Sequence, residues 1–587
     1  MLYCAGIRWT ISRNFFYTVR MRRKIIEIDC RKRVVAEEEM TEDYELLWGR
    51  GLSSTLVAER GDPGAHPLGP SNPLVFAAGM AAGSLLSSGN RLSAGAKSPL
   101  TGGIKESNAG GTAAFKLGRL GVKALVLKDV PDEPSPSMGI RISRDGVALE
   151  DLSFVRGKNA YETARLLYSR YGESVGLLLI GSAGERRLLS SCISATDLEG
   201  EPCRNFGRGG LGAVMGSKGV KAIIIDDEGC DDPYAGDAGV KGAISEFRQR
   251  LRENPVTGEN FPKYGTTMIL STVNALGGLP TRGFSEGAFE DAEALYAESI
   301  RETILKRGGR PAHPCMPGCV MQCSNKYVRE DGSPLVGSFD YETVCLMGSN
   351  LGLSSLDEIA ELNYLCNDIG VDTIETGNAL GVLSEAGIFS FGDFEEIRSL
   401  VEEIGKGSPI GRIAGSGAGV CGEVYGVERV PVVKNQGMAA YDPRAIKGLG
   451  VTYSVSPMGA DHTAGNAVLL DIDHKDPSVQ VEPVRDLHIT TTILDILGLC
   501  FFSAEVSLGD PEKLGQMVGA FSGRDVSFQE LRKISKQLLK TEREFNRKAG
   551  LGEETDRLPE FMRREALPPT GSVFDVPEED LKGFYNF

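Results

Sequence analysis

The sequence predicts an α+β protein of several domains, in which a β-rich N-terminal domain is followed by mainly helical domains. Its 587 residues suffice for about two to four domains with large cores. Short apolar segments alternate with helical ones up to about residue 226, whereas helical patterns dominate the chain from there on. In addition, 74 glycines, far above ordinary usage, indicate many tight turns and places where the backbone approaches a ligand closely.

The strands predicted in the N-terminal domain are short apolar segments bounded by turn residues. They comprise residues 24–30, 33–37, 72–78, 124–127, 175–180 and 221–226. Helices are predicted at residues 42–47 and 112–120. No Gly-x-Gly-x-x-Gly motif follows one of these predicted strands at the place that a Rossmann dinucleotide site requires, so no such site is predicted. We also find no tandem repeat of fixed period.

The remainder of the chain reads as a series of helices, and the domain boundaries follow from this change. Helices are predicted at residues 240–254, 264–276, 291–306, 355–369, 373–386, 393–406 and, as a long amphipathic element, 527–549. From residue 559 the chain is expected to wrap over the surface as a tail. The predicted parts are a leader (1–23), the β-rich domain (24–226) and two helical domains (227–430 and 431–587).

Composition limits the partners and the compartment. The net charge of −16 argues against nucleic acid or an anionic membrane as a main partner. No run of about 18 apolar residues appears, so no membrane span is predicted. Residues 1–23 are basic and aromatic without the apolar region of a secretory signal, and we expect a disordered leader or untranslated sequence ahead of Met21. The cysteine spacing gives no disulfide framework, which favours a reducing cytoplasm.

Three cysteines within nine residues form the most informative motif. Cys315, Cys319 and Cys323 are spaced Cys-x3-Cys-x3-Cys, and Pro317 and Gly318 between them prevent a regular helix. The segment is therefore a loop whose thiols can turn toward one centre. Three thiolates on a loop with a fourth from elsewhere are the usual ligands of an iron–sulfur cluster. Zinc is an alternative, although Cys4 zinc sites favour Cys-x2-Cys pairs, and incidental clustering of thiols is the third.

A glycine-rich turn that carries arginines suggests phosphate binding. Residues 204–218 form this turn and lead into a short helix and a strand. Such a turn exposes backbone N–H groups and a helix N-terminus, which together suit phosphate oxygens, and an arginine adds a bidentate donor. Arg91 and Asn108 lie upstream in similar surroundings, which favours phosphate binding over an ordinary turn.

Two segments repeat one short pattern. Residues 367–372 and 495–500 share the form [N/D]-x-x-G-apolar-[D/C] at the end of a predicted helix. In each, glycine can end the helix in the left-handed conformation while the acid or amide accepts hydrogen bonds from a ligand. Two such half-sites suit a ligand with two similar halves, whereas an ordinary helix C-cap is the alternative for either one alone.

Together these motifs resemble the tungsten-containing aldehyde:ferredoxin oxidoreductase family, whose metal is held by two pyranopterin dithiolenes beside a [4Fe–4S] cluster. The resemblance extends from about residue 24 to the C-terminal region, and it depends on residues 97–102, 207–218, 315–323 and 495–500. It implies that two sheets of the β-rich domain form a base for the bis-pterin cofactor. The two helical domains would cover that base, with a substrate channel between them.

The resemblance also implies the ligand sets. Four cysteines would hold the cluster, although the first gap is one residue longer than the usual Cys-x2-Cys-x3-Cys: Cys315, Cys319, Cys323 and Cys500. The pterin phosphates, bridged by Mg²⁺, would contact Arg91, Asn108, Gly110, Arg204, Gly207, Arg208, Gly209, Gly210 and Gly212. One pterin would bind Asn367, Gly370, Val371 and Asp372, and the other would bind Asp495 and Leu499.

The chemistry implied by the resemblance is oxidation of an aldehyde to the carboxylic acid, with Glu342 as general base and His462 as hydrogen-bond donor to the carbonyl oxygen. Electrons would leave through the cluster to ferredoxin or a similar carrier. Some members of the family join subunits through an iron held by a Glu-x-x-His pair. Here Tyr364 stands three residues after Glu361 in place of the histidine, so this iron is not expected. A homodimer stays one option for the assembly.

Several alternatives remain open at this point. The metal is tungsten or molybdenum, because it contacts cofactor rather than side chains. The second enzymatic hypothesis is a related catalytic subunit that acts on an aromatic acyl thioester. The hypothesis from another functional class is a non-catalytic iron–sulfur electron-transfer protein.

Overall fold

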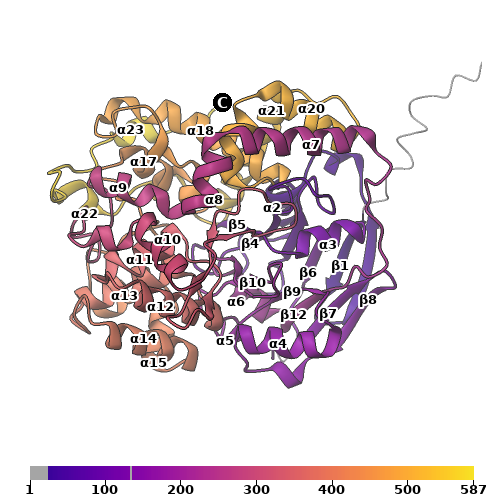
Figure 1. The fold of residues 1–587 in the computed structure, drawn as a ribbon, viewed down its shortest axis with the longest axis horizontal. Coiled ribbons are helices and arrows are strands. Elements are labelled where there is room, and N and C mark those ends of the chain that lie inside the picture. The colour runs from indigo at the N-terminus through magenta and orange to yellow at the C-terminus, as the bar shows by residue number, and fades with distance from the viewer. Residues whose placement is uncertain (1–23, 133–134) are drawn as a thin grey trace, which may run out of the picture.

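A computed structural model describes residues 24–132 and 135–587, so the predicted leader 1–23 lies outside the described residues. Two six-stranded mixed sheets make up the N-terminal part, and a mainly helical region follows (Figure 1). This confirms the predicted α+β fold with two sheets in the β-rich domain.

The two sheets have the same topology. The first has the order β2-β1-β6-β3-β4-β5 and the second β8-β7-β12-β9-β10-β11. In each, an antiparallel hairpin at one edge joins a parallel neighbour, and an antiparallel series of strands follows. The first sheet comprises β1 (Lys24–Asp29), β2 (Val34–Glu39), β3 (Leu74–Ala78), β4 (Leu92–Lys97), β5 (Ile104–Ala109) and β6 (Val122–Lys128). The second comprises β7 (Met138–Ser143), β8 (Gly146–Asp151), β9 (Gly176–Leu179), β10 (Ile193–Ala195), β11 (Arg204–Phe206) and β12 (Val220–Ile225).

The register of the strands makes the two units directly comparable. On β5 Asn108 pairs with Ser93 of β4, and on β11 Asn205 pairs with Ser194 of β10. The chain therefore contains a repeated β unit. Its connecting segments differ in length, which is why a search for a fixed period does not find it. Strands β4 and β5 also escaped prediction, because their residues are small or polar rather than apolar.

Helices complete the first two hundred residues and form most of the rest. Those of the β units are α2 (Gly49–Arg60), α3 (Ala113–Arg119), α4 (Ala160–Tyr171), α5 (Ser182–Glu185) and α6 (Leu211–Ser217). The next are α7 (Ala238–Glu253), α8 (Phe261–Tyr264), α9 (Leu270–Ala275), α10 (Ala297–Lys306), α11 (Tyr341–Leu346), α12 (Leu356–Ile369), α13 (Thr373–Glu385), α14 (Phe394–Lys406), α15 (Pro409–Ala414) and α16 (Ala418–Tyr425). The last are α17 (Lys447–Val455), α18 (Val481–Leu497), α19 (Ala504–Leu508), α20 (Pro511–Ser522), α21 (Phe528–Lys548), α22 (Glu560–Arg564) and α23 (Glu578–Leu581).

Most predicted helices are confirmed, although residues 291–306 form α10 only from Ala297, after a 3-10 turn (Ala292–Leu295). Two other predicted helices are wrong. Residues 264–276 do not form one helix, because Gly265 adopts φ +68° and separates α8 from a 3-10 turn (Thr266–Ile269) and α9. Residues 42–47 contain only a 3-10 turn (Glu42–Tyr44), and the helix begins later, at Gly49.

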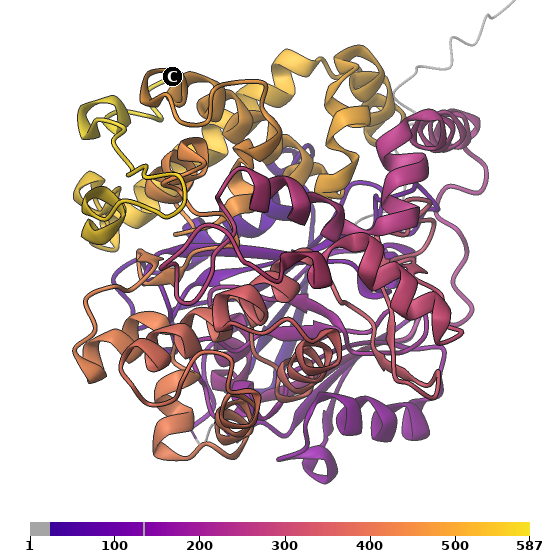
Figure 2. The ribbon, with the colours of Figure 1, turned by 60° about the vertical axis from the view of Figure 1, so that its left-hand side comes forward.

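The C-terminal tail runs over the edge of the helical region, as expected, and buried apolar side chains anchor it there. The tail is yellow in Figure 2 and lies at the periphery of the molecule. Phe561, Met562 and Phe574 are buried in the same hydrophobic cluster as Leu449 and Val451 of α17. Burial of each aromatic ring contributes about 1.5–3 kcal/mol, enough to fix a segment with little secondary structure of its own.

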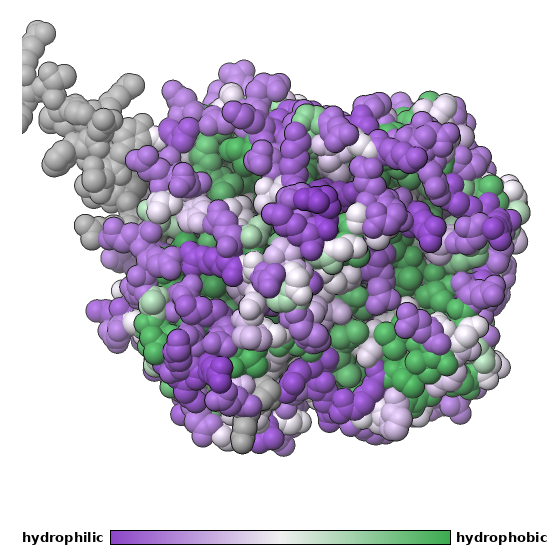
Figure 3. Space-filling view, turned by 180° about the vertical axis from the view of Figure 1, so that it is seen from behind, coloured by the Kyte–Doolittle hydropathy of each residue, from purple (hydrophilic) through white to green (hydrophobic). Residues whose placement is uncertain are grey.

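The described surface carries no obvious membrane-spanning element. Among the described residues, no single helix is long and apolar enough to cross a membrane, and one sharply bent pair, Pro477–Leu497 with Phe501–Leu508, meets the length and composition criteria only in combination. The face shown in Figure 3 is covered largely by hydrophilic side chains, with smaller hydrophobic areas exposed between them.

Candidate active site

The predicted site residues from distant parts of the chain meet at one cavity of about 480 Å³ between the two sheets and the helical region. Both β units, the cysteine loop, α11 and the ends of α12 and α18 contribute to its wall. The predicted residues on this wall are Arg91, Asn108, Gly110, Arg204, Gly207, Arg208, Cys315, Cys323, Glu342, Asn367, Val371, Asp372, His462, Asp495 and Cys500.

Six predicted residues lie behind the wall rather than on it: Gly209, Gly210, Gly212, Gly370, Leu499 and Cys319. The glycines act through backbone shape. A Cβ at Gly212 would collide with the Cys192 carbonyl oxygen, and Gly209 and Gly210 have φ of +84° and +74°. Leu499 is buried in the hydrophobic cluster that also contains Cys319 and Cys500. A contact of these six with a ligand stays a prediction.

One half-site lies at the end of α12. Gly370 ends this helix in the left-handed conformation (φ 82°), and Asp372 caps α13 by accepting hydrogen bonds from the Ile374 and Glu375 N–H groups, both at 3.1 Å. Arg208 Nε lies 3.3 Å from the Asp372 carboxylate. Burial raises the pKa of Asp372 and the Arg208 guanidinium opposes that shift. The carboxylate thus holds Arg208 and the helix end in place.

Two amides complete this half-site. Asn367, three residues before Gly370, accepts a hydrogen bond at 2.8 Å from Asn205 Nδ2 of β11. Asn205 Oδ1 and Asn367 Nδ2 are buried and have no partner among the described residues. The pair therefore offers one acceptor and one donor to the cavity. Such a combination can hydrogen-bond to the edge of a heterocycle.

The second half-site repeats this backbone arrangement at the end of α18. Gly498 ends the helix with φ 67°, and Asp495 stands three residues before it, as Asn367 does before Gly370. Asp495 accepts hydrogen bonds from Asn108 Nδ2 of β5 at 3.4 Å and from Arg50 Nη1 at 3.1 Å. Asn108 and Asn205 occupy matching positions in the two β units. The repeated pattern in the sequence therefore corresponds to two similarly built half-sites.

Three of the four predicted cysteine ligands line the cavity, Cys315, Cys323 and Cys500, and Cys319 lies behind them. Hydrogen bonds fix their loops to the first β unit: Gly111 N–H donates to the Cys315 carbonyl at 2.7 Å, and Cys500 N–H donates to the Ser88 carbonyl at 2.8 Å. A hydrogen bond from the Cys319 thiol, aided by the nearby Arg204 and Arg91 guanidiniums, lowers the pKa of Cys315 to about 6. Metal ligands must be thiolates, so this environment fits a metal cluster.

The thiols also influence one another. Burial raises the pKa of Cys323, and the charges of Cys500 and Cys315 raise it further. Among the described residues, no group of three or more His, Cys, Asp or Glu side chains is close enough to hold a single metal ion. The fit of this loop to a cluster thus depends on the shared surroundings of its thiols.

An acid–base pair faces the same cavity. Glu342 lies in the first turn of α11, accepts a hydrogen bond from the Ala440 N–H at 2.8 Å through Oε2, and places Oε1 3.3 Å from His462 Nε2. Burial raises the pKa of Glu342, which the charge of His462 partly offsets. The His462 ring packs on Tyr441 at 5.9 Å between centroids. This is the arrangement of a proton acceptor beside a hydrogen-bond donor.

Several buried polar atoms on the cavity wall have no partner among the described residues: Glu106 Oε1, Arg204 Nε, Asn205 Oδ1, Asp340 Oδ1, Asn367 Nδ2 and His462 Nδ1. Each unpaired buried polar atom costs about 1–3 kcal/mol. Such a concentration at one cavity fits a polar ligand that both donates and accepts hydrogen bonds, as a pterin does.

Sequence reasoning missed several residues of the wall. Glu106 precedes Asn108 by two positions and so faces the same side of β5, a signal that strand alternation could have given. Asn205 lies inside the predicted arginine turn, and Asp461 is adjacent to His462. Tyr441 and Asp340 carry no pattern in the sequence, because only the fold brings them to the cavity.

The outer wall of the cavity is apolar. Phe261, Met268 and Ile269 line it from one side, and Val468 and Leu469 line it from the other. Leu469 is 74% exposed, which places it at the opening to solvent. The polar half-sites therefore continue into an apolar passage.

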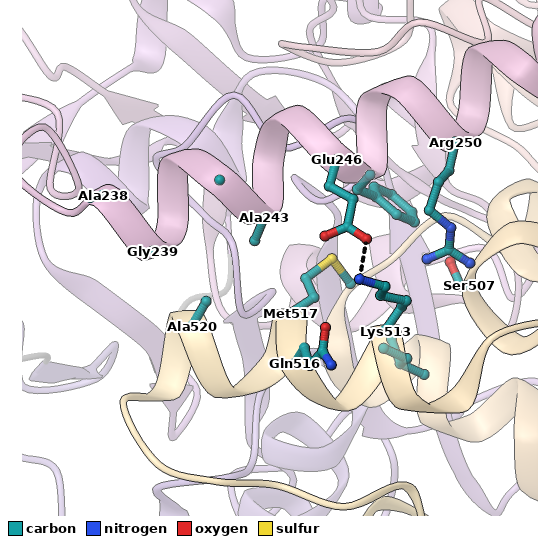
Figure 4. Close-up of a pocket in the computed structure, with 13 residues that line it drawn as sticks. Ala238, Gly239, Ala243, Glu246, Arg250, Ser507, Lys513, Gln516, Met517 and Ala520 are labelled. Atoms are coloured by element: carbon teal, nitrogen blue, oxygen red, sulfur yellow. Dashed lines mark ion pairs between the residues drawn. The ribbon is translucent and has the colours of Figure 1, made fainter.

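A second, smaller pocket of about 280 Å³ lies between α7 and α20 (Figure 4). Small residues of α7 such as Ala238 and Gly239 form one side, and Glu246 bridges to Lys513 of α20 at 2.8 Å. Arg250 donates to the Val506 carbonyl at 2.6 Å. Its charged groups thus serve helix packing, and the pocket has no feature of a reaction site.

Comparison with known proteins agrees with this geometry. A family model described as aldehyde ferredoxin oxidoreductase, N-terminal domain, matches residues 25–227, and one described as domains 2 and 3 of the same enzyme matches residues 242–587. The tungsten-containing aldehyde ferredoxin oxidoreductase of Pyrococcus horikoshii is 31% identical over 575 residues, covering 93% of this chain and 92% of that protein. The corresponding protein of Thermococcus kodakarensis is 32% identical over 565 residues, covering 91% and 90%.

More distant relatives have other substrates in their names. The aliphatic sulfonate oxidoreductase, WOR-like subunit, of Pyrococcus furiosus is 26% identical and covers 76% of this chain and 75% of that protein. The active site complex BamBC of benzoyl coenzyme A reductase with 1,5-dienoyl-CoA shares the fold, with a TM-score of 0.75, 19% identity and coverage of 92% and 90%. On the two family models and the tungsten-enzyme relatives, the chain is an oxidoreductase that belongs to the aldehyde ferredoxin oxidoreductase family.

Proposed function

We propose that the protein oxidises a small, neutral aldehyde to the carboxylic acid at a bis-pyranopterin tungsten or molybdenum centre. Two electrons would pass one at a time through a [4Fe–4S] cluster to ferredoxin or a similar iron–sulfur carrier. The observation that carries the proposal is the Glu342–His462 pair, 3.3 Å apart, on the wall of the cavity that both half-sites and the cysteines share.

The residues present fit the proposed groups. Asn205 and Asn367 would hold one pterin and Asn108 and Asp495 the other. Three guanidiniums on the cavity wall would face the phosphates and their Mg²⁺: Arg91, Arg204 and Arg208. The four cysteines would hold the cluster. When bound, the metal–pterin group would supply two-electron redox chemistry.

The chain's own residues would orient the aldehyde and move the proton. In the overall reaction an aldehyde and water give the acid, two protons and two electrons. His462 Nδ1, which has no partner among the described residues, is suited to donate a hydrogen bond to the carbonyl oxygen. Glu342 Oε1 would accept the proton lost as oxygen adds to the carbonyl carbon. Because burial raises its pKa, Glu342 is a better base than an exposed carboxylate at neutral pH.

The apolar passage favours a neutral substrate. A sulfonate or the phosphates of a coenzyme A thioester would need cations on the passage wall. The arginines of the cavity are engaged deeper, where Arg91 donates to the Asn108 carbonyl at 2.8 Å and Arg204 to the Gly337 carbonyl at 2.9 Å. Met268, Ile269 and Val468 instead suit an alkyl or aryl group.

The proposed electron exit is the surface over the cysteine loop. Leu85 is 51% exposed, and its backbone packs against Gly318, between Cys315 and Cys319. Arg248 Nη2 donates to the Leu85 carbonyl at 3.2 Å. An apolar side chain beside a cation suits an acidic iron–sulfur carrier. The eleven cysteines of the described ranges are all free thiols, which supports a reducing cytoplasm as the compartment.

The variant Glu342→Gln tests the proposed reaction. Loss of the base should lower aldehyde turnover by about 10²–10⁴-fold with an artificial one-electron acceptor. The content of tungsten or molybdenum and of iron should stay at the wild-type level, because Glu342 holds neither. Undiminished turnover in a metal-replete variant would remove Glu342 from the mechanism.

A further inference from the structure

Glu106 is an acidic residue inside the cavity for which the reaction above has no use. Its side chain lines the cavity from β5, only 6% exposed, on the same strand face as Asn108. Ser93 of β4 hydrogen-bonds to its carboxyl group, whereas Oε1 has no partner among the described residues. One oxygen of a buried carboxyl group is thus left for whatever fills this half of the cavity.

Within the described residues, the surrounding charges leave Glu106 without a cation of its own. Arg50 of α2 donates two hydrogen bonds to Glu542 of α21, at 3.0 and 2.7 Å, and one to Asp495 of α18, at 3.1 Å. The preceding residue, Lys105, pairs with Asp461 at 2.6 Å. One buried guanidinium therefore serves two carboxylates already, and Glu106 is the third carboxyl group beside it.

The remaining neighbours do not change this balance. Arg91 is engaged by Asn108, and the Met458 sulfur accepts the Glu106 N–H at 3.2 Å. His488, whose pKa Arg50 is close enough to affect, is fully buried with a pKa lowered to about 3, so it is neutral. Burial and the Asp495 carboxylate together raise the pKa of Glu106 to about 7. At neutral pH a large share of the Glu106 carboxyl groups therefore carries a proton.

The matching position of the second β unit lacks this acid. Cys203 stands two residues before Asn205, as Glu106 stands two before Asn108. Its thiol donates to Asp197 at 3.4 Å, and Asp197 is held in turn by His313 at 2.7 Å. Of these two matching positions, only the one beside Asp495 presents a carboxyl oxygen without a partner among the described residues.

We propose that Glu106 is a further cofactor-binding residue of the Asp495 half-site, donating a hydrogen bond from its protonated carboxyl group to an acceptor atom of the bound pterin. As pH rises through neutrality the proton is lost, and a carboxylate beside Asp495 can no longer donate. Retention of the pterin therefore weakens in alkali. This inference rests on the proposed function, because it requires a pterin in the cavity.

The test measures pterin and metal retained per chain by anaerobically purified holoenzyme during prolonged gel filtration at pH 6 and pH 8.5. Loss of one buried hydrogen bond corresponds to about tenfold faster release, so the wild type should lose pterin about tenfold faster at pH 8.5. Glu106→Gln keeps the volume and an N–H donor, and its retention should not depend on pH. Glu106→Ala should release pterin rapidly at both pH values.

Cys203→Ser is the matched control at the equivalent position and should behave as the wild type does. A Glu106→Gln protein with the wild-type pH dependence would overturn the inference, and so would a Glu106→Ala protein with undiminished retention. In both cases the pterin is present and the proposed function survives. A wild-type protein that holds neither pterin nor tungsten or molybdenum would overturn both.

Discussion

The two half-sites share one backbone design and differ in charge. Each consists of a helix ended by a left-handed glycine, an amide or acid three residues before it, and an asparagine at the same position of a β unit. At the α12 end, the contact is between two neutral amides, Asn205 and Asn367. At the α18 end, Asp495, Glu106 and Glu542 surround a single guanidinium, Arg50.

This difference shows that the backbone fixes where the polar groups of a half-site lie, whereas the side chains fix their charge. The repeated fold places the polar atoms. The side chains then decide whether the asparagine of the β unit contacts a neutral amide, Asn367, or a carboxyl group, Asp495. The residue two positions after each helix-ending glycine also differs. After Gly370 it is Asp372, which caps α13, and after Gly498 it is Cys500, a predicted cluster ligand. A scaffold with internal symmetry can thus hold a ligand with two similar halves and still treat the halves differently.

Removal of Arg50 should have the largest effect on stability. Arg50→Met leaves Glu542 and Asp495 buried without their shared cation, and breaking a buried ion pair in this way costs about 3–5 kcal/mol. Denaturant unfolding measures this loss. Arg208→Met is the counterpart in the other half-site and should cost less, because Asp372 keeps two backbone N–H donors. Equal losses would mean that the half-sites do not differ in charge as described.

The second-largest expected effect is the contribution of Glu106 to the pH dependence of the free energy of unfolding. The folded state raises its pKa from 4.5 to about 7, so the folded protein binds the proton more tightly than the unfolded chain. Stability from this group is full below about pH 4.5 and is lost as pH rises to about 7, by on the order of 3 kcal/mol. Glu106→Gln should therefore gain stability relative to the wild type at pH 8 but not at pH 4.5.

The control for this prediction is Cys203→Ser, which should show the same stability difference from the wild type at both pH values. Burial keeps the pKa of Cys203 well above 9, outside the range tested. If Glu106→Gln were equally shifted at pH 4.5 and pH 8, the carboxyl group would not be titrating in the folded protein.

The two helix-ending glycines give the smallest expected difference. Alanine at either position is strained by positive φ, at a cost of about 1 kcal/mol. Gly498→Ala should cost more than Gly370→Ala, because its Cβ would meet the Gly79 Cα directly, whereas at Gly370 the nearest atom is the Gly181 nitrogen at 3.0 Å. The midpoint temperatures of thermal unfolding of the two variants would rank these stability costs. The reverse ranking would contradict the packing described for α18.

Much of the fold was predictable because local signals agree with the tertiary structure. The helices α10, α12, α13, α14 and α21 follow their apolar periodicity and caps, such as Ser355 and Ser527. The repeated β unit was not predictable, since β4, β5, β10 and β11 are short or polar and gain their strand conformation from sheet pairing.

The site divides in the same way. Residues within compact motifs, such as Cys315, Asp372 and Asp495, could be predicted, and the fold brings them to one cavity. Arg50 and Glu542 could not, because they lie in separate helices and meet Asp495 only through packing. Glu106 was missed because its neighbours suggested phosphate binding, and nothing in a strand sequence shows that a carboxyl group lacks a cation.

The most direct test of the account is the metal and pterin content of protein purified without oxygen from a host that makes the pterin. The account predicts about one tungsten or molybdenum, about two pterins and about four irons per chain. Iron without pterin and without either metal would contradict the two half-sites as cofactor sites and favour an electron-transfer protein. Zinc in place of iron would contradict the cluster itself.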